Sequence, residues 1–321
     1  MTSSQDPFSE ILNLANSKAI CSGSMTAEEP WAVLLPPPAM LKFFAVMRGR
    51  CYLKVEGEAG PHELQEGDVV LFNMSRRYIL ASDLTMEPID VAKHYKPNVT
   101  KAQLGNGKDF AMIGCHAHLD RSSGFSIVDV LPEMIHLRAE SAQAPVLKWL
   151  LDQLVQESNN DLPGGAAAAA QIAHLIFIHV LRAHLNSNTT MPAGWLRAMS
   201  DERLLPAVRQ MHNEPGRAWS LIELAKTANM SRTTFAEHFK NVAGVAPLAY
   251  LTEWRMRLAE AALREKNVSV SDLSESLGYT SVSAFSNAFK RVIGKAPQRV
   301  RTDARQHVDE DAAMAMMMVG T

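Results

Sequence analysis

An internal repeat in the C-terminal third constrains the fold of this chain more than any other feature of its 321 residues. Residues 231–247 align with residues 281–297 at a constant offset of 50 positions. The identical pairs include Phe235 with Phe285, Phe239 with Phe289, Lys240 with Lys290, Gly244 with Gly294, and Ala246-Pro247 with Ala296-Pro297. Because the same apolar and glycine positions recur together, we expect one supersecondary unit to occur twice.

Each copy carries the signals of a helix, a tight turn and a second helix. The first helix opens with a serine followed three residues later by an acidic residue, at 220–223 and at 269–272, which is the pattern of a capping box. Asn229 and Gly278 suit the left-handed conformation that ends a helix, and the second copy has one extra residue in its turn. The paired phenylalanines lie four residues apart and share the inner face of the second helix. The sequence therefore predicts two helix-turn-helix units.

One continuous helix is predicted between the copies, over residues 247–265. At 1.5 Å per residue it would be roughly 27 Å long. A rigid spacer of this length suits two recognition helices placed in successive major grooves, about 34 Å apart.

Charge is distributed unevenly along the chain. Residues 200–305 hold 16 lysine and arginine residues against 11 aspartate and glutamate residues, whereas residues 1–199 hold 16 against 20. A basic module on an acidic remainder is typical of polyanion binding. A repeat of helical hairpins that binds proteins is the alternative, and the matched caps on the basic half favour double-stranded promoter DNA.

The residues between the paired phenylalanines point outward, where base edges in a major groove would be within reach. The predicted base contacts are Arg232, Thr233, Thr234 and Glu237 in the first copy, and Val282, Ser283, Ser286 and Asn287 in the second. The predicted phosphate contacts are Lys240, Lys290 and Arg291.

These residues resemble the double motif of the AraC/XylS transcription regulators over about 100 positions. The resemblance rests on Trp219-Ser220-Leu221, Leu224-Ala225, Met230-Ser231-Arg232, Phe235, Phe239-Lys240, Gly244, Pro247, Tyr250-Leu251, Trp254-Arg255-Met256, Gly278-Tyr279-Thr280-Ser281, Phe285, Ala288-Phe289-Lys290-Arg291, Gly294 and Pro297. Ser274 stands where the family usually has a core alanine. Glu237 stands where an arginine is common on the first recognition helix, and Asn287 occupies the corresponding place on the second. The resemblance implies a sequence-specific regulator, taken here as an activator with repression left open, and RNA polymerase as a candidate partner.

The N-terminal part has the pattern of short strands separated by turns. Residues 51–56 alternate strictly, and Gly67-Asp68 introduces a second run at 69–72. Such strands from Trp31 to about Val130 predict an antiparallel barrel or sandwich, after an irregular or partly helical lead-in. Helical patterns follow from Pro145 and over 166–185.

We therefore expect an α+β protein, in which an N-terminal antiparallel β cupin-like barrel with trailing helices precedes an all-α domain of two helix-turn-helix units. The expected boundaries are 1–185 for a sensor and dimerisation domain, 186–194 for a linker, 195–305 for the DNA-binding domain, and 306–321 for a disordered tail.

The front half is similar to the cupin-type sensor domain of one AraC subfamily. The similarity lies in Arg48-Gly49-Arg50-Cys51-Tyr52-Leu53, in Leu64 with Gly67-Asp68-Val69-Val70-Leu71-Phe72, and in Leu131-Pro132. Metal-dependent cupins carry His-x-His after such a glycine, whereas residues 73–78 contain no histidine. We therefore expect no cofactor and no enzyme, with a metal-independent cupin enzyme fused to a DNA-binding module as the alternative. A DNA-repair alkyltransferase would need four zinc-binding cysteines, and this chain has three.

Two groups of residues in the front half are candidates for chemistry, one for metal binding and one for redox sensing. His116 and His118 would share a face of a strand, but two ligands do not complete a metal site. The subfamily resemblance includes oxidant sensors, which implies Cys21 and Cys115 as redox candidates. Inert buried cysteines, or a small effector held in the barrel, remain open alternatives.

The apolar helix at 166–185 predicts a homodimer. Its apolar residues exceed what one core face requires, namely Ile172, Leu175, Ile176, Val180 and Leu181. Burial of the whole helix against its own sheet is the alternative. Histidines, Gln171 and Arg182 interrupt the helix, so we expect it to be too polar for a membrane span. Residues 1–10 lack the pattern of a signal peptide, and a cytoplasmic location without membrane contact is the expectation.

Overall fold

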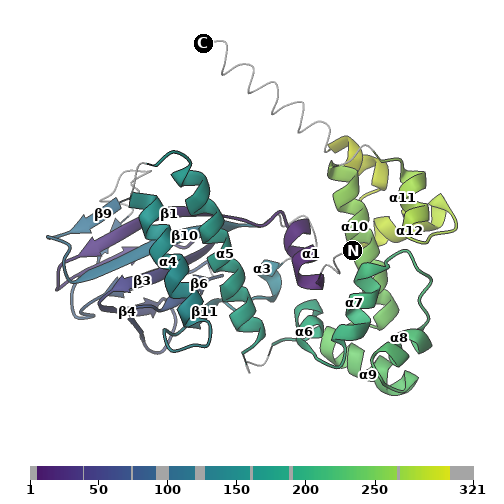
Figure 1. Cartoon of the computed structure of the whole chain (residues 1–321), viewed down its shortest axis with the longest axis horizontal. Helices are drawn as coiled ribbons and strands as arrows, with labels where there is room; N and C mark the ends of the chain where they lie inside the picture. The colour runs from purple at the N-terminus through teal and green to yellow at the C-terminus, as the bar shows by residue number, and fades with distance from the viewer. Residues whose placement is uncertain are drawn as a thin grey trace, which may run out of the picture. The chain divides into compact units, whose positions relative to one another are not determined.

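The computed structural model describes residues 6–38, 40–73, 75–91, 101–119, 127–159, 162–187, 191–265 and 268–303. These residues form two compact units. The β unit comprises the described residues of 16–119 and 127–189, and the helical unit comprises those of 1–15 and 190–321. The predicted α+β class, with strands first and helices last, is confirmed (Figure 1).

The β unit is built from two sheets (Figure 1). The six-stranded sheet has the order β11 (Met134–Leu137), β6 (Val69–Phe72), β3 (Leu41–Arg48), β10 (Phe110–His118), β1 (Lys18–Ala27) and β9 (Lys101–Leu104). The five-stranded sheet has the order β5 (His62–Gln65), β4 (Arg50–Val55), β7 (Tyr78–Ala81), β2 (Ala32–Leu35) and β8 (Ile89–Asp90). Neighbouring strands are antiparallel except for β1–β9 and β2–β8, which are parallel. Each sheet therefore contains one parallel pair, whereas the sequence predicted antiparallel strands throughout.

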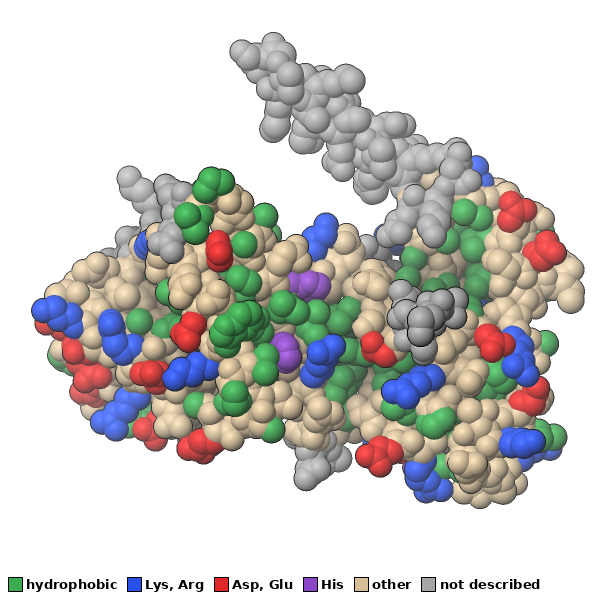
Figure 2. All heavy atoms as spheres, in the orientation of Figure 1, with side chains coloured by type: hydrophobic (Ala, Val, Ile, Leu, Met, Phe, Trp, Pro, Cys, Tyr) green, Lys and Arg blue, Asp and Glu red, His purple; other side chains and the backbone are tan. Residues whose placement is uncertain are grey.

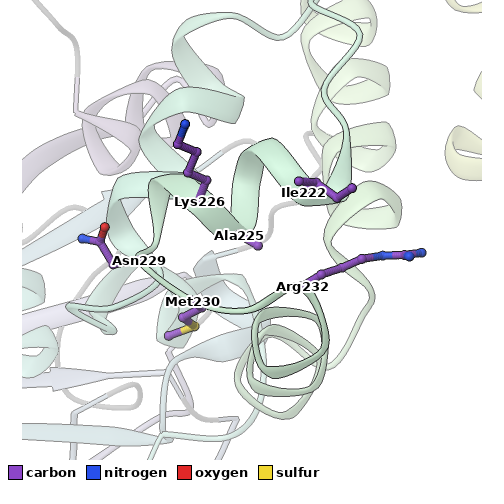
Figure 3. A pocket seen from close by; sticks show the side chains of 6 residues that line it. All are labelled: Ile222, Ala225, Lys226, Asn229, Met230 and Arg232. Carbon is purple, nitrogen blue, oxygen red and sulfur yellow. The ribbon is translucent and has the colours of Figure 1, made fainter.

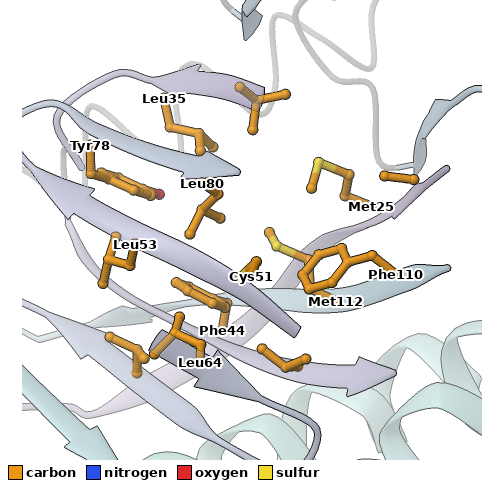
Figure 4. Close-up of a cluster of buried hydrophobic side chains, with 14 of the residues drawn as sticks. Met25, Leu35, Phe44, Cys51, Leu53, Leu64, Tyr78, Leu80, Phe110 and Met112 are labelled. Carbon is orange, nitrogen blue, oxygen red and sulfur yellow. The ribbon is translucent and has the colours of Figure 1, made fainter. Parts of the chain in front are cut away.

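An apolar core fills the space between the two sheets (Figure 4). The alternation predicted for β4 places Cys51, Leu53 and Val55 in this core, while Lys54 points to solvent. From the opposite sheet, Phe44 lies 5.6 Å from Phe72 between ring centroids. Burial of these side chains is the main stabilising contribution to the unit.

The six-stranded sheet is covered on its other face by two helices, α4 (Ala144–Asn159) and α5 (Gly165–Leu185) (Figure 1). Consecutive residues of a strand point to opposite faces, so Phe43 turns away from the inner core and stacks against Phe177 of α5, with 6.4 Å between ring centroids. Both faces of this sheet are therefore buried. This explains why β6 consists of four buried apolar residues in a row.

The N-terminal lead-in is more ordered than the sequence predicted. Residues 18–27 form β1, a ten-residue strand that pairs with β10 over most of its length. Its small and polar side chains give little strand signal, and pairing with distant strands stabilises it. Before it, α1 (Pro7–Leu14) is capped by Asp6, which accepts from the Ser9 N–H at 3.0 Å. The expected first domain included this helix, whereas contacts group α1 with the helical unit.

Helix α5 is long and apolar enough to cross a membrane by length and composition, with a mean hydropathy of 1.5. The sequence expectation that it is too polar is therefore wrong on composition. Its buried residues, including Ile176, Phe177 and Val180, pack within the β unit. The same composition is typical of a core helix.

The helical unit follows the predicted pattern of helices after residue 195. Its elements are α6 (Trp195–Ser200), α7 (Leu205–Asn213), α8 (Leu221–Thr227), α9 (Arg232–Ala243), α10 (Pro247–Glu265), α11 (Val270–Ser276) and α12 (Val282–Ile293). The connecting helix predicted over 247–265 is confirmed by α10. The short α3 (Ile127–Val130) belongs to the β unit. The tail predicted over 306–321 lies outside the described residues.

Candidate nucleic-acid interface

The first helix-turn-helix unit, α8 with α9, has the local geometry that its sequence predicts. Ser220 Oγ accepts from the Glu223 N–H at 3.2 Å, and the Glu223 carboxylate accepts from the Ser220 N–H at 2.8 Å, which completes a capping box. Asn229 ends α8 with a φ of +53°. Ser231 then caps α9 by accepting from the Thr234 N–H at 3.2 Å. Gly244 ends that helix with a φ of +75°.

The second unit, α11 with α12, repeats this geometry with one change. Ser269 Oγ accepts from the Asp272 N–H at 3.0 Å, which is the serine half of the box. Gly278 takes the place of Asn229 with a φ of +78°, and Ser281 caps α12 by accepting from the Ala284 N–H at 3.2 Å. The turn spans residues 277–280, against 228–230 in the first unit. The predicted extra residue in the second turn is confirmed.

The inner faces of α9 and α12 hold the paired phenylalanines. Phe235, Phe239, Phe285 and Phe289 are fully buried. Each pair contacts a tyrosine edge-on, since Phe239 lies 5.5 Å from Tyr250 and Phe285 lies 5.5 Å from Tyr279. These contacts fix the rotation of each recognition helix about its own axis.

The outer faces carry the predicted contact residues. Ser286 is half-buried, and the others are exposed: Arg232, Thr233, Thr234, Glu237, Lys240, Val282, Ser283, Asn287, Lys290 and Arg291. The structure thus brings each predicted set onto one solvent-facing helix surface. Side chains on such a surface can reach base edges and phosphates.

A hydrogen bond that the sequence did not reveal orients α9. His238 contacts Asp201 with 2.8 Å between Nε2 and Oδ2. Asp201 also accepts from the Leu204 N–H at 3.0 Å, at the turn between α6 and α7. Since the two residues are 37 positions apart, no local pattern indicates this pairing.

An open pocket adjoins the start of α9 (Figure 3). It is lined by Ile222, Ala225, Lys226, Asn229, Met230 and Arg232. Lys226 is exposed on α8 and extends the basic surface beyond the residues that the sequence indicated.

The two redox candidates lie opposite each other on adjacent strands of the β unit. Cys21 of β1 pairs with Cys115 of β10 in the antiparallel ladder. The Cys21 sulfur lies 3.7 Å from the Gly114 carbonyl oxygen and 3.8 Å from the Ser158 hydroxyl. Cys21 is half-buried, whereas Cys115 is buried.

This environment separates the pKa values of the three thiols. Hydrogen bonding from Cys115, assisted by Ser158 and the Gly23 backbone and opposed by burial, lowers the pKa of Cys21 to about 6. The same interaction with Cys21, together with burial, raises the pKa of Cys115. Burial in the inner core raises the pKa of Cys51 to about 12. Cys21 is therefore the thiol that ionises near neutral pH.

The histidine pair at the end of β10 is joined by no third potential metal ligand within the part of the chain that the structure describes. Among the described residues, no group of three or more His, Cys, Asp or Glu side chains could hold a metal ion. His116 lies beside Lys42 of β3, and burial with this positive charge lowers the pKa of His116.

Comparison with known proteins identifies the family. Residues 6–186 match the cupin family, and residues 224–303 match the helix-turn-helix domain family. A putative AraC-like transcription regulator of Streptomyces lividans is 35% identical over 305 residues, covering 94% of this chain and 98% of that protein. The chain belongs to the AraC-like transcription regulators.

Two other relatives of this family are similar to the chain. A putative AraC-like transcription regulator of Streptomyces antibioticus is 36% identical over 94% of this chain and 99% of its own length. The RCS-specific HTH-type transcriptional activator RclR of Escherichia coli is 34% identical over 55% of this chain and 62% of its own length. The AraC-like chain described here is thus a DNA-binding transcription regulator with a cupin domain at its front.

Proposed function

We propose that this chain is a one-component regulator, in which α9 and α12 bind promoter DNA and the β unit adjusts that binding in response to an oxidant. The observation that carries the first half is the matched pair of recognition helices, each with buried phenylalanines and exposed polar residues. Lys240, Lys290 and Arg291 would neutralise phosphates. We place the regulator in the cytoplasm, with RNA polymerase as its second macromolecular partner.

The sensing half of the proposal rests on the cysteine pair. Directly opposed residues of antiparallel strands have Cα atoms about 4.5–5.5 Å apart. A disulfide needs about 4.4–6.8 Å between Cα atoms. Cys21 and Cys115 occupy such opposed positions, and Cys21 has the lowered pKa of a reactive thiol.

The chemistry takes two steps with hydrogen peroxide as the oxidant. The Cys21 thiolate attacks one peroxide oxygen, the O–O bond breaks, and hydroxide leaves a sulfenic acid on Cys21. The Cys115 sulfur then attacks the Cys21 sulfur, Cys115 loses its proton, and water leaves. The two thiols are oxidised to one disulfide while one peroxide is reduced to water.

A connection to the DNA-binding helices starts at α1. Only residues 15–17 separate α1 from the strand that carries Cys21. Within the helical unit, the Glu10 carboxylate of α1 contacts His212 Nδ1 at 2.9 Å, and His212 Nε2 contacts the Tyr250 hydroxyl at 2.9 Å. His212 also stacks on Trp254 with 3.8 Å between ring centroids. A shift of β1 would therefore pull on a helix that is tied to α7 and α10.

The redox step is tested by comparing DNA affinity before and after peroxide. We expect oxidation of the wild type to change affinity by about 5- to 150-fold, the usual range of coupling between two sites. Cys21→Ser should bind equally in both conditions, and Cys51→Ala is the matched control that should respond like the wild type. Alkylation of Cys21 should have its midpoint at pH about 6. Equal affinities of reduced and oxidised wild type would remove the redox proposal.

An effector held between the sheets is the second candidate for the signal. The inner core is filled by large side chains, among them Phe44, Phe72, Tyr78 and Phe110, each under 2% exposed. This packing favours the oxidant over a small molecule. The full-length relatives are named as transcription regulators, which supports a β unit without catalysis over a cupin enzyme.

We also propose that a second copy of the chain binds the outer face of α4 and α5. The apolar residues of α5 from which the sequence predicted a dimer are only partly available for one. Ile176, Val180 and Leu181 are buried within the β unit, so the prediction is wrong for these three. Ile172 is half-buried, and Leu175 is exposed. Leu175 is joined by two exposed residues of α4, Val146 and Trp149. Figure 2 shows hydrophobic side chains at the surface over these helices.

Sedimentation at tens of micromolar tests this dimer. We expect the wild type to sediment as a dimer and Trp149→Asp as a monomer, because Trp149 is 61% exposed, the largest exposed fraction of the three residues, and aromatic residues often dominate interface energies. Leu84→Asp, at an exposed apolar position elsewhere on the β unit, is the control and should remain dimeric. A monomeric wild type would contradict the proposal.

A further inference from the structure

The two helix-turn-helix units touch each other at a pair of glycines. Gly216 lies in the loop before α8, and Gly278 lies in the turn between α11 and α12. A Cβ on Gly216 would lie 2.2 Å from the Ser276 carbonyl oxygen, and a Cβ on Gly278 would lie 2.1 Å from the Gly216 carbonyl oxygen. The backbones of the two units are therefore in contact, and only glycine fits on either side.

Arg255 of the connecting helix contacts the backbone around Gly216 and the ring next to Gly278. From α10, its Nε donates to the Pro215 carbonyl at 2.5 Å, and its Nη2 donates to the Arg217 carbonyl at 2.7 Å. These two carbonyls flank Gly216. The guanidinium carbon lies 5.9 Å from the centroid of the Tyr279 ring, next to Gly278. One planar side chain thus contacts the loop of the first unit and the turn of the second.

Arg255 contributes to neither hydrophobic core. The first unit packs on α10 through Tyr250, which contacts Phe239. The second unit packs on α10 through Met256 and Ala259, which belong to its apolar cluster. Loss of the Arg255 side chain would leave both sets of contacts in place and remove its hydrogen bonds to the loop around Gly216 and its contact with Tyr279.

We infer that Arg255 is a positioning residue, which holds α9 and α12 at one separation. Arg255 thereby sets the spacing that the regulator accepts between its two DNA boxes, which are the base sequences that α9 and α12 each contact. This inference rests on the proposed binding of both helices to DNA. Because Arg255 of α10 binds two backbone carbonyls of the first unit and the glycine backbones of the two units are in contact, the two units move as one rigid body. One inserted base pair rotates a box by about 34–36° and moves it about 3.4 Å, which such a body cannot follow.

The test measures how the full-length protein tolerates changes in spacing. A duplex selected by the protein from a randomised pool is compared with versions that have one base pair added or removed between the boxes. For the wild type we expect the change to lower affinity about 10- to 100-fold, the loss of the contacts to one box. For Arg255→Met we expect weaker binding at the native spacing. The fold-loss of affinity when the spacing is changed should be less than about a third of the wild-type loss, since a looser link adapts to either spacing.

Two further variants keep the result interpretable. Arg264→Met removes an arginine from the same helix that bonds to Glu260 at 2.8 Å, and it should keep the wild-type spacing profile. Arg255→Lys keeps the charge and stem without the fork, and it carries the test if Arg255→Met does not fold by circular dichroism.

A wild-type spacing profile in a folded Arg255 variant would overturn the inference. A different result would overturn the proposed DNA contacts instead: wild-type affinity that does not change when the bases of one whole box are scrambled. The two failures are therefore distinguishable.

Discussion

The two helix-turn-helix units of this regulator match on their inner faces and differ on their outer faces. Phe235 and Phe285 are both fully buried, and Gly244 and Gly294 end their helices at φ values of +75° and +81°. The outer positions share almost no identity. The first helix presents Arg232, Thr233, Thr234 and Glu237, and the second presents Val282, Ser283, Ser286 and Asn287. The comparison teaches that packing dictates the inner residues, whereas the exposed outer residues are free of that constraint.

This difference in outer chemistry predicts different modes of recognition. An arginine and a glutamate on α9 suit guanine and cytosine edges, respectively. On α12, Asn287 suits adenine, and the apolar Val282 suits a thymine methyl group. We therefore expect two boxes of unlike sequence, although the units share one fold.

The largest expected effect tests the likeness of the inner faces. Phe235→Ala and Phe285→Ala should each lower the free energy of unfolding of their unit by about 3–5 kcal/mol, because both side chains are fully buried. Urea denaturation followed by circular dichroism measures both changes. A loss at one position of less than half the loss at the other would break the structural equivalence of the two units. Arg299→Ala, on an exposed side chain near the end of the helical unit, is the control.

A second effect should distinguish the units in acid. Burial holds the pKa of His212 below its ordinary value of 6.5, partly offset by Glu10. Below pH 6.5 the unfolded chain binds a proton that the folded chain does not, so stability falls as pH falls, by up to about 1.4 kcal/mol per pH unit. The contacts of His212 with Tyr250 and Trp254 link it to the core under the first unit, whereas the second core is built from Met256, Phe285 and other apolar residues.

Hydrogen exchange resolved along the chain measures this difference. Between pH 6.5 and 5, protection of α7 and α9 should fall faster than protection of α12, after correction for intrinsic exchange. His212→Gln should remove the difference. Equal losses of protection in α9 and α12 in the wild type would contradict the local role of His212.

The smallest effect concerns the caps. Ser220→Ala and Ser269→Ala should each cost about 1 kcal/mol, since each serine accepts from a helical N–H. Glu223→Ala should cost more than Asp272→Ala, because the Glu223 carboxylate also bonds to the Ser220 N–H. Thermal denaturation of the four variants measures the order. An equal or larger loss for Asp272→Ala would contradict the importance of the Glu223 hydrogen bond to the Ser220 N–H.

The two helix-turn-helix units were predictable because their helices and turns depend on neighbouring residues. Ser231, Gly244 and the phenylalanine pair are enough to place α9, and their repetition at an offset of 50 places α12. The continuous apolar run of β6 was equally visible between its turns. In these places local propensity and burial agree.

The features that the sequence did not reveal depend on distant partners. Strand β1 is stabilised by β10 and β9, which are more than seventy positions away along the chain. The direct opposition of Cys21 and Cys115 depends on the register of that pairing, whereas the family resemblance indicated only that both cysteines are redox candidates. The joint of Arg255 with the two glycines likewise needs three segments that only the folded chain brings together.

The most direct test of the account is to change the outer face of one helix only. The double variant Ser283→Arg with Asn287→Ala alters α12 at two exposed positions and leaves its phenylalanines in place. Selection from a randomised duplex pool should give a new preference in one box, with the other box unchanged and with about 1–3 kcal/mol of discrimination at the altered positions. The same preference in both boxes as for the wild type would contradict the claim that α12 reads DNA through these residues.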